Sequence, residues 1–398
     1  MNYKLIGQRN LRKYTEEGQS PTYAASIEAQ NIVNALCDIE WSKTSEKDAI
    51  MTYHTEDVVD EVDGKKINGL DMNVLIRDKF DAALFCADHT GGRHRAYANA
   101  AVYHYELPDG TLPKLTPPAK PAQLNLCLQW WGIPVADDVN AKLDYLEANG
   151  YQAVEVPSDL GWLRDKGLKV AESLKNRKLF LATACGGSQF DRLDKAKNDA
   201  EVARFMPVLE VLGEMKSVGL IICPARGNPE MGLKELREDF VKNTGRRLAE
   251  KAAKCGTTIV LEPLQRGETP FLRQVADGAK MAQEIGPGCT VMGDFWHMSK
   301  EDPSFFGAFV SAGRLLTHVH IASLARRKIP GSDGAADNYV DGFKGLKFIG
   351  YRGAVSVEAG FLEKGRDAKN KPIWPSNEEK QKILAGMCRM LREQWEQA

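Results

Sequence analysis

Four successive apolar segments in the second half of the chain each end in, or are directly followed by, a side chain that can bind a metal ion. These side chains are Glu262, Asp294, His320 and Glu358. Three carboxylates packed together would repel one another and hold raised pKa values unless a cation lay among them. Carboxylate and imidazole donors suit Mn²⁺, Co²⁺, Fe²⁺, Zn²⁺ or Mg²⁺. The pattern therefore predicts a site for one divalent metal ion, for which we favour Mn²⁺.

Two further histidines accompany this set. His318 and His320 are two residues apart, so in a strand both side chains point to the same face. Only the histidine nearer the end of the strand should reach the metal, and we expect this to be His320, with His318 behind it. His297 lies one helical turn after Asp294, near enough to contact a bound substrate, although a lone histidine is equally compatible with a structural role.

The segments that must position these residues belong to a strand-then-helix alternation that begins at Gln123. The predicted strands are apolar almost throughout, which is typical of a parallel sheet buried on both faces. Eight such units fit the size of a TIM barrel, in which functional residues lie at the carboxyl ends of the strands. A doubly wound open sheet is the alternative, but the sequence has no glycine-rich nucleotide-binding motif to support it. The predicted strands are 124–128, 153–156, 179–182, 219–222, 257–261, 290–292, 316–319 and 354–357.

Helices are predicted between and after these strands. Their apolar periodicity places them at 138–149, 201–216, 233–254 and 271–285. The last helix, 380–397, follows a capping box formed by Ser376 and Glu379.

The first 120 residues differ from this alternation. Their patterns predict helices at 24–36 and 70–85 and a strand at 95–106. Five prolines between Pro108 and Pro121 disfavour both helix and sheet, so we expect a linker and a domain boundary there. The predicted fold class is therefore α/β: a (β/α)8 TIM barrel at 121–398 with a smaller N-terminal α+β domain at 1–120.

Composition and charge restrict the partners and the compartment. A content of 43% hydrophobic and 27% charged residues is ordinary for a globular protein. Because the net charge is only −1, neither a nucleic acid nor a membrane is expected as a partner. The eight cysteines are scattered without a C-x-x-C pair, which favours reduced thiols. The N-terminus lacks the apolar core of a signal peptide, and no segment is long enough to span a membrane. We expect a cytoplasmic protein.

The ordered motifs resemble those of one known family. Glu262 lies in V-L-E-P-L, Asp294 and His297 lie in G-D-F-W-H, His320 lies in H-V-H-I-A, and Glu358 lies in V-S-V-E. The passage R-R-K-I-P-G-S-D-G from Arg326, followed by Asp337 and then G-L-K-F-I-G-Y-R-G, matches the same family. Residues 123–398 thus resemble the xylose isomerase-like TIM-barrel superfamily, in its sugar epimerase and isomerase branch, which includes the ketose 3-epimerases. The first 120 residues have no counterpart in the simple epimerases.

The resemblance implies a role for each matching residue. Glu262, Asp294, His320 and Glu358 would hold the metal, Glu262 and Glu358 would also act as acid and base, and His297 and Arg326 would hold substrate oxygens. Because Arg326 and Arg327 are adjacent, either one could be the arginine that faces the site. The family's habit implies a homo-oligomer, and its substrate would be a sugar or keto-sugar.

The expected chemistry is proton abstraction next to a carbonyl through a metal-stabilised enediolate. Glu262 and Glu358, first and last of the set, would flank the substrate, and removing a proton on one face and returning it on the other gives epimerisation or isomerisation. A leaving group β to the carbanion would instead give a lyase or dehydratase acting on a keto-sugar, a keto-inositol or a 3-keto-glycoside. An endonuclease IV-like repair enzyme would need more histidines and a more basic surface, and a binding scaffold would leave three clustered carboxylates unexplained.

Overall fold

The coordinates form a computed structural model of the whole chain. The structure describes residues 121–398 apart from Asn228, Pro303, Ala335 and Ala368. Of the preceding part it describes the backbone of the strands at 2–10, 49–55, 58–59, 66–67, 70–76, 81–88 and 99–106.

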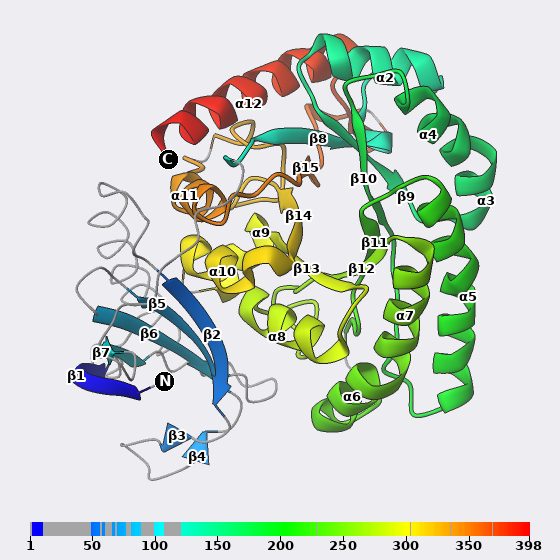
Figure 1. The fold of residues 1–398 in the computed structure, drawn as a ribbon. Helices are drawn as coiled ribbons and strands as arrows, with labels where there is room; N and C mark the ends of the chain where they lie inside the picture. The colour runs from blue at the N-terminus through cyan, green and yellow to red at the C-terminus, as the bar shows by residue number, and fades with distance from the viewer. Residues whose placement is uncertain are drawn as a thin grey trace.

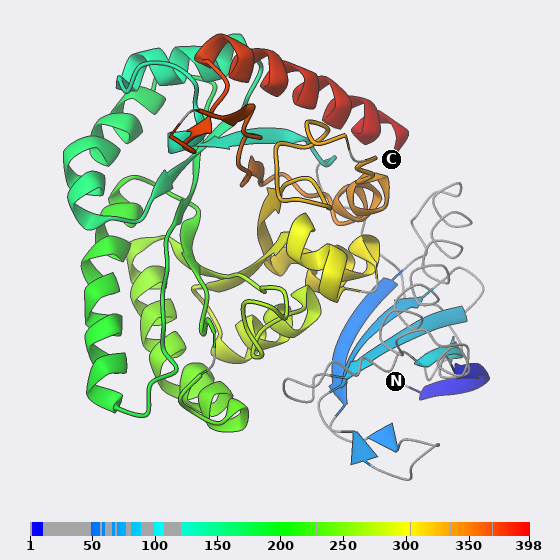
Figure 2. The same cartoon turned by 180° about the vertical axis from the view of Figure 1, so that it is seen from behind.

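Eight parallel strands close into a barrel, and helices surround it (Figure 1). The ring closes because β15 pairs with β8, which puts Ala354 opposite Asn125, so the alternative of an open sheet is wrong. Figure 2 shows the same ring from behind, with the helices on its outer side. Each predicted strand overlaps one observed strand. The observed strands are β8 (Asn125–Gln129), β9 (Ala153–Pro157), β10 (Phe180–Cys185), β11 (Gly219–Ile222), β12 (Thr258–Leu261), β13 (Cys289–Asp294), β14 (Leu316–Ile321) and β15 (Ala354–Val357).

The helices follow the predicted alternation with small shifts of their ends. The capping box at Ser376 and Glu379 is confirmed, because each side chain bonds the backbone N–H of the other. Asp138 was expected inside a helix and is instead its N-cap. The principal helices are α2 (Val139–Ala148), α3 (Leu160–Trp162), α4 (Leu168–Leu174), α5 (Lys195–Glu214), α6 (Leu233–Asp239), α7 (Gly245–Cys255), α8 (Val275–Ile285), α9 (Phe295–Glu301), α10 (Phe305–Ala312), α11 (Val340–Phe348) and α12 (Asn377–Gln397).

Shorter elements complete the barrel region. Single turns are η3 (Trp130–Gly132), η4 (Leu163–Gly167), η5 (Phe240–Thr244) and η6 (Gly313–Leu315), and a small hairpin pairs β16 (Gly365–Arg366) with β17 (Pro372–Ile373). None of the helices in the described residues is long and apolar enough to cross a membrane.

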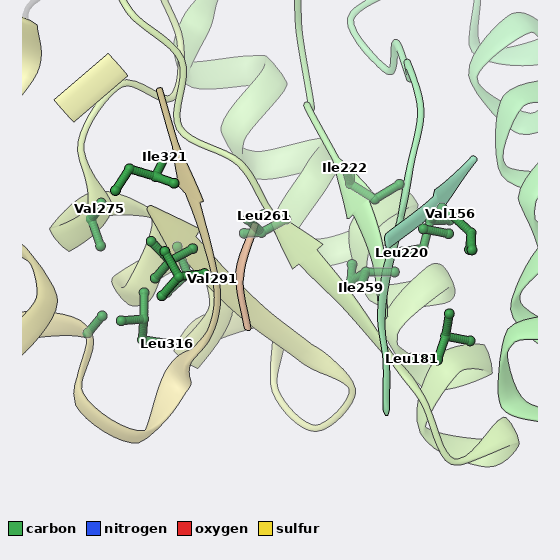
Figure 3. Packing of buried hydrophobic residues seen from close by; sticks show 14 of the residues in the cluster. Val156, Leu181, Leu220, Ile222, Ile259, Leu261, Val275, Val291, Leu316 and Ile321 are labelled. Carbon is green, nitrogen blue, oxygen red and sulfur yellow. The ribbon is translucent and has the colours of Figure 1, made fainter. Parts of the chain in front are cut away.

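Alternate side chains of each strand belong to two different cores. Ile259 and Leu261 of β12 pack in the large cluster that also contains helix residues, and Figure 3 shows members of this cluster, among them Val275 of α8. Val260, between them, belongs to a small cluster with Ile221 and Met292 that contains no helix residue. Since successive strand side chains point to opposite faces, the first set faces the helices and the second fills the barrel interior. Glu262 has the parity of Val260, so the same alternation turns it inward.

The N-terminal strands form a separate antiparallel sheet in the order β1-β7-β6-β5-β2. Its strands are β1 (Asn2–Asn10), β2 (Ala49–Thr55), β5 (Leu70–Ile76), β6 (Asp81–Asp88) and β7 (Asn99–Glu106), and a two-residue pair joins β3 (Val58–Val59) to β4 (Lys66–Ile67). The predicted strand at 95–106 coincides with β7 over its described part. The predicted helix at 24–36 and the predicted linker at 108–121 lie outside the described residues, apart from the last residue of the linker.

The predicted helix at 70–85 is wrong. This stretch forms β5 and β6, which pair in antiparallel fashion with Leu75 opposite Ala83. The apolar residues Leu70, Met72, Val74 and Ile76 recur at every second position, which is the period of a strand. The helical interpretation used a different subset of apolar residues that happened to recur about every four positions.

Gly288 fixes the start of β13, the strand that carries Asp294, and a substitution there tests the barrel packing. Its φ is +87°, and a Cβ atom would lie 2.0 Å from the carbonyl oxygen of Ala249. Gly256 also has a positive φ, +75°, but no atom lies within 4 Å of its would-be Cβ. Gly288→Ala should therefore combine overpacking with backbone strain and destabilise the protein by about 2–4 kcal/mol. Gly256→Ala should lose only about 1 kcal/mol.

Urea-induced unfolding of both variants, followed by circular dichroism, measures this difference. Equal midpoints for Gly288→Ala and Gly256→Ala would show that the contact with Ala249 does not constrain the start of β13.

Candidate active site

Four inward-facing side chains converge at the carboxyl ends of neighbouring strands. Glu262 directly follows β12, Asp294 ends β13, His320 lies near the end of β14, and Glu358 directly follows β15. The strand register aligns them, because Asp294 pairs with His320 and the N–H of Glu358 donates to the carbonyl of Ile321. One ligand atom from each of the four lies within 4.8 Å of those of the other three. The structure thus brings together all four residues that the sequence nominated as metal ligands.

The three carboxylates of this cluster have different electrostatic surroundings. Burial, reinforced by the charge of Glu358, raises the pKa of Glu262 to about 8. Burial likewise raises the pKa of Asp294 to about 6. Burial also opposes ionisation of Glu358, but the positive charges of His320 and Arg327 outweigh it and lower the pKa of Glu358 to about 2. Near neutral pH, the metal-free cluster therefore has an ionised Glu358 beside a protonated Glu262.

His320 lies between two acidic groups. Its Nδ1 atom is 3.1 Å from Oε2 of Glu358 and 3.9 Å from Oε1 of Glu262. Its Nε2 atom is 2.9 Å from Oε2 of Glu155. Burial alone would lower the pKa of His320, but the charges of Glu155 and Glu358 raise it well above its usual value. In the metal-free protein, an imidazolium therefore partly neutralises the cluster.

Glu155, which the sequence analysis did not single out, is the centre of a second buried polar group. It lies in β9, and its Oε2 atom is 2.7 Å from Nε2 of His318. Thr183 donates to the same oxygen at 3.0 Å, and Gln129 donates to Oε1 at 2.7 Å. His318 therefore lies behind His320, as expected. The available signal was strand parity for Gln129 and Glu155, which have the parity of the interior residues Cys127 and Ala153. Parity does not predict Thr183, because β10 has an irregularity between Leu181 and Ala184.

His297 is buried beside the cluster as a neutral imidazole. Its Nδ1 atom accepts a hydrogen bond from the N–H of Gln265 at 3.0 Å, so the proton of the neutral ring is on Nε2. Burial lowers the pKa of His297 to about 3, which keeps the ring uncharged at neutral pH. Nε2 lies 3.4 Å from Oδ2 of Asp294 and has no hydrogen-bond partner among the described residues. A buried donor thus points towards the acidic cluster.

The arginine that enters the cluster is Arg327, not Arg326. Nη2 of Arg327 lies 2.6 Å from Oε2 of Glu358 and 3.4 Å from Oδ2 of Asp294. Arg326 is exposed. The preference for Arg326 therefore needs correction. The physical reason is local: Arg327 has a φ of +53°, and this left-handed turn directs its side chain, rather than that of its neighbour, towards the strands.

Hydrogen bonds to Asp337 and contacts of the Arg327 side chain both hold the loop that carries Arg327. Asp337 accepts hydrogen bonds from the backbone N–H groups of Leu324 and Gly331, both at 2.9 Å. The guanidinium of Arg327 lies 4.7 Å from the ring centroid of Trp296, and its Nη1 atom is 3.5 Å from Glu268. A residue with a strained φ persists where its surroundings fix it, so these contacts give the arginine one position.

The chemistry of the donor set fits a divalent cation. Oε1 of Glu262 is buried without a hydrogen-bond partner in the described part of the chain, although it lies among acidic neighbours. Buried polar atoms are normally paired, so this oxygen lacks a partner that a cation would supply. Three carboxylates and one imidazole also match the ligand preference of Mn²⁺ and related ions.

Comparison with known proteins gives consistent similarities. The chain is 28% identical over 236 residues to a 3-dehydro-D-guloside 4-epimerase of Escherichia coli (strain K12), covering 56% of this chain and 87% of that protein. It is 29% identical over 229 residues to an L-ribulose 3-epimerase of Methylomonas sp. (strain DH-1), covering 56% and 77% respectively.

Solved structures share the fold. The apo crystal structure of a 3-keto-D-glucoside 4-epimerase from E. coli superposes with a TM-score of 0.56 and 22% sequence identity, over 67% of this chain and all of that one. Residues 143–374, more than half of the 398, match the family described as Xylose isomerase-like TIM barrel. With its closed parallel barrel, the chain therefore belongs to the xylose isomerase-like TIM barrel family.

Proposed function

We propose that this protein is a metal-dependent sugar epimerase or isomerase that removes and returns a proton on a carbon next to a carbonyl group. The observation that carries the proposal is the convergence of four potential metal ligands within 4.8 Å at the ends of β12 to β15. The relatives named as sugar epimerases support a small sugar or keto-sugar as substrate.

Glu262, Asp294, His320 and Glu358 are the side chains that would hold the cation, and Mn²⁺ is our first choice among the divalent ions. A cation bound there would stabilise negative charge on a neighbouring substrate oxygen and so make the adjacent C–H bond more acidic. The protein must then supply groups that carry the proton and groups that fix the substrate.

Glu262 and Glu358 are the proposed acid and base. Their strands are separated by β13 and β14, so the two carboxylates approach the centre of the cluster from different sides. Environments that separate the pKa values of two carboxyl groups are typical of acid–base pairs, and these pKa values are about 8 and about 2 in the metal-free protein. One carboxylate would remove the proton from one face of the carbon, and the other would return a proton to the opposite face.

His297 and Arg327 are the proposed substrate-binding residues. The Nε2–H of His297 is a neutral donor that lacks a protein acceptor among the described residues, so it can donate to a sugar hydroxyl or carbonyl oxygen. Arg327, whose side chain is 26% exposed, presents further donors from the side of the β14–α11 loop. Arg327 contacts Glu358 and Asp294, and His297 lies beside Asp294, so an oxygen that they hold would lie next to the cluster that contains the proposed acid and base.

The wider organisation of the protein is also a proposal. We infer an N-terminal domain at 1–120, a barrel at 121–398, assembly into a homo-oligomer and a cytoplasmic location. All six cysteines in the described residues are free thiols, which supports a reducing compartment. The net charge of −1 gives no support for a nucleic-acid partner.

Replacement of either proposed acid–base residue should nearly abolish proton exchange. We expect Glu358→Gln and Glu262→Gln each to lower turnover by about 10²–10⁴-fold, the usual contribution of one general acid or base. The measurement is incorporation of solvent deuterium beside the carbonyl when D-fructose, L-ribulose or a 3-keto-glucoside is incubated with the Mn²⁺-loaded enzyme in D₂O. Glu363→Gln, an exposed glutamate in the loop after β15, is the matched control and should exchange like the wild type.

Full exchange in Glu358→Gln would exclude it as a proton carrier. Release of water or an aglycone without deuterium return would favour the lyase alternative over an epimerase.

The two adjacent arginines should differ in their effect on substrate use. Arg327→Met removes a charge-assisted donor and should lower kcat/KM by about 10–100-fold, equivalent to about 1.5–3 kcal/mol. Arg326→Met should leave kcat/KM unchanged, because Arg326 is exposed outside the cluster. Steady-state kinetics of the two variants provides the comparison, and the opposite ranking would restore Arg326 as the substrate-binding arginine.

Removal of the cation should make stability depend on pH between pH 7 and 8. Folded Glu262 keeps its proton until its pKa of about 8, whereas an unfolded glutamate ionises near pH 4.3. His320 is also protonated in the folded protein, because its pKa is raised, and neutral in the unfolded chain above pH about 6.5. Both groups bind more protons in the folded state, so the free energy of unfolding should fall with rising pH by about 1 kcal/mol or more over this interval.

Urea unfolding at pH 7 and pH 8, with EDTA or with Mn²⁺, measures this effect. Mn²⁺ should largely remove the pH dependence because it replaces the bound protons. Glu262→Gln should reduce the dependence in EDTA. An identical slope in EDTA and Mn²⁺ would argue that no cation binds in this cluster.

A further inference from the structure

The carboxylate of Glu155, inside the barrel, makes several hydrogen bonds. Its carboxylate is completely buried and contacts four donors: Gln129 at Oε1, and Thr183, His318 and His320 at Oε2. None of these contacts exceeds 3.0 Å. A buried carboxylate with this many short contacts fixes its neighbours in position.

The contacts also determine which ring nitrogen of each histidine bears the proton. An ionised carboxylate can only accept hydrogen bonds, so Nε2 of both His318 and His320 must carry hydrogen towards Glu155. The other ring nitrogen of His320, Nδ1, then points to Glu358 and Glu262, at 3.1 Å and 3.9 Å from their nearest oxygens. A metal ligand needs the lone pair of a neutral imidazole nitrogen on that side.

We propose that Glu155 is a positioning residue that fixes the ring orientation and the tautomer of His320, so that Nδ1 faces the cation site. This inference rests on the proposed function, since His320 is one of the four proposed ligands. Carboxylates that hold a ligand histidine by its second nitrogen are a general device of metal sites, because they orient the ring and make it more basic. Glu155 belongs to β9, the third strand around the ring from β14, and thus supports the ligand through the barrel interior.

A second cation among Glu155, His318 and His320 is the competing interpretation, because their ligand atoms also lie within 4.8 Å of one another. The distances oppose it. Nitrogen and oxygen ligands that lie about 2.0–2.2 Å from one metal are separated from each other by about 3 Å or more. The observed separations of 2.7 Å and 2.9 Å are those of direct hydrogen bonds, and Oε2 of Glu155 is also contacted by Thr183.

The affinity of the protein for Mn²⁺ tests the proposal. The Kd is obtained from the signal of free Mn²⁺ in electron paramagnetic resonance titrations of the full-length chain. Glu155→Leu, which has no acceptor, should weaken Mn²⁺ binding by about 10–100-fold, the usual effect of losing such a partner. Glu155→Gln keeps one acceptor oxygen without the charge and should give an intermediate Kd. It also keeps the test valid if Glu155→Leu does not fold.

Ser356→Ala is the matched control. Ser356 is completely buried, faces the barrel interior and lies opposite His320 in the strand register, yet it has no hydrogen bond to Glu155. Its loss should leave the Kd unchanged, although thermal stability could change in all three variants. If both Glu155 variants bind Mn²⁺ like the wild type, the proposal is overturned, and two Mn²⁺ ions per wild-type chain would establish the competing site instead.

The tautomer of His320, recorded at a pH high enough to make its ring neutral, is a second readout that does not depend on a bound cation. Long-range ¹H–¹⁵N spectra of protein labelled at its seven histidines, with the His320 signals assigned by His320→Gln, report which nitrogen carries hydrogen. The wild type should have hydrogen on Nε2 of His320, and Glu155→Leu should lose this preference. A wild type that has this signature but binds no Mn²⁺ would reject the proposed function while supporting the role of Glu155. A hydrogen only on Nδ1 would reject the role of Glu155 itself.

Discussion

The closed barrel sends every second strand side chain into a mostly buried interior, and the chemistry of the site depends on this constraint. Inward positions near the carboxyl ends carry polar side-chain atoms on all eight strands, counting residues just beyond a strand end: Gln129, Glu155, Thr183, Cys223, Glu262, Asp294, His320 and Glu358. Four of these residues are acidic, whereas the basic side chains among them are His320 and Arg327, which enters from a loop. Concentrated negative charge at low dielectric is unfavourable unless it is paired or protonated. A divalent cation would offset this excess of negative charge. Without it, the protons on Glu262 and His320 reduce the excess.

The interior below this polar layer explains why the charges interact so strongly. Ile221, Val260 and Met292 fill the barrel beneath Glu262, and they cannot solvate a carboxylate. Burial is accordingly the largest cause of the raised pKa values of Glu262 and Asp294. The same apolar packing holds the strands in register, so the residues that make the fold stable are also those that tune the acids.

Sequence alone could predict the parts of the site that local rules determine. Strand alternation places Glu262, Asp294 and Glu358 at strand ends, and closure of the barrel then brings them together. Sequence alone could not determine whether Arg326 or Arg327 faces the site, because the answer depends on a left-handed turn in the loop between β14 and α11. The helix expected at 70–85 failed for a related reason: its apolar residues satisfy both helical and strand periods, and pairing with β6 decides between them.

The sequence pattern does not identify Glu155, because its strand continues to Pro157, whereas that pattern consists of residues that end or follow a strand. Its importance follows from a contact that spans the barrel, from β9 to β14, which no local pattern encodes. His320 is the one residue shared by the two groups of potential ligands in the described chain. In the lower group, both oxygens of Glu155 accept hydrogen bonds. In the upper group, Oε1 of Glu262 has no partner among the described residues, and the side chain of Glu358 is 24% exposed. The hydrogen bonds of Glu155 can therefore fix the orientation of the His320 ring, and this orientation directs the lone pair of Nδ1 towards the other three proposed metal ligands.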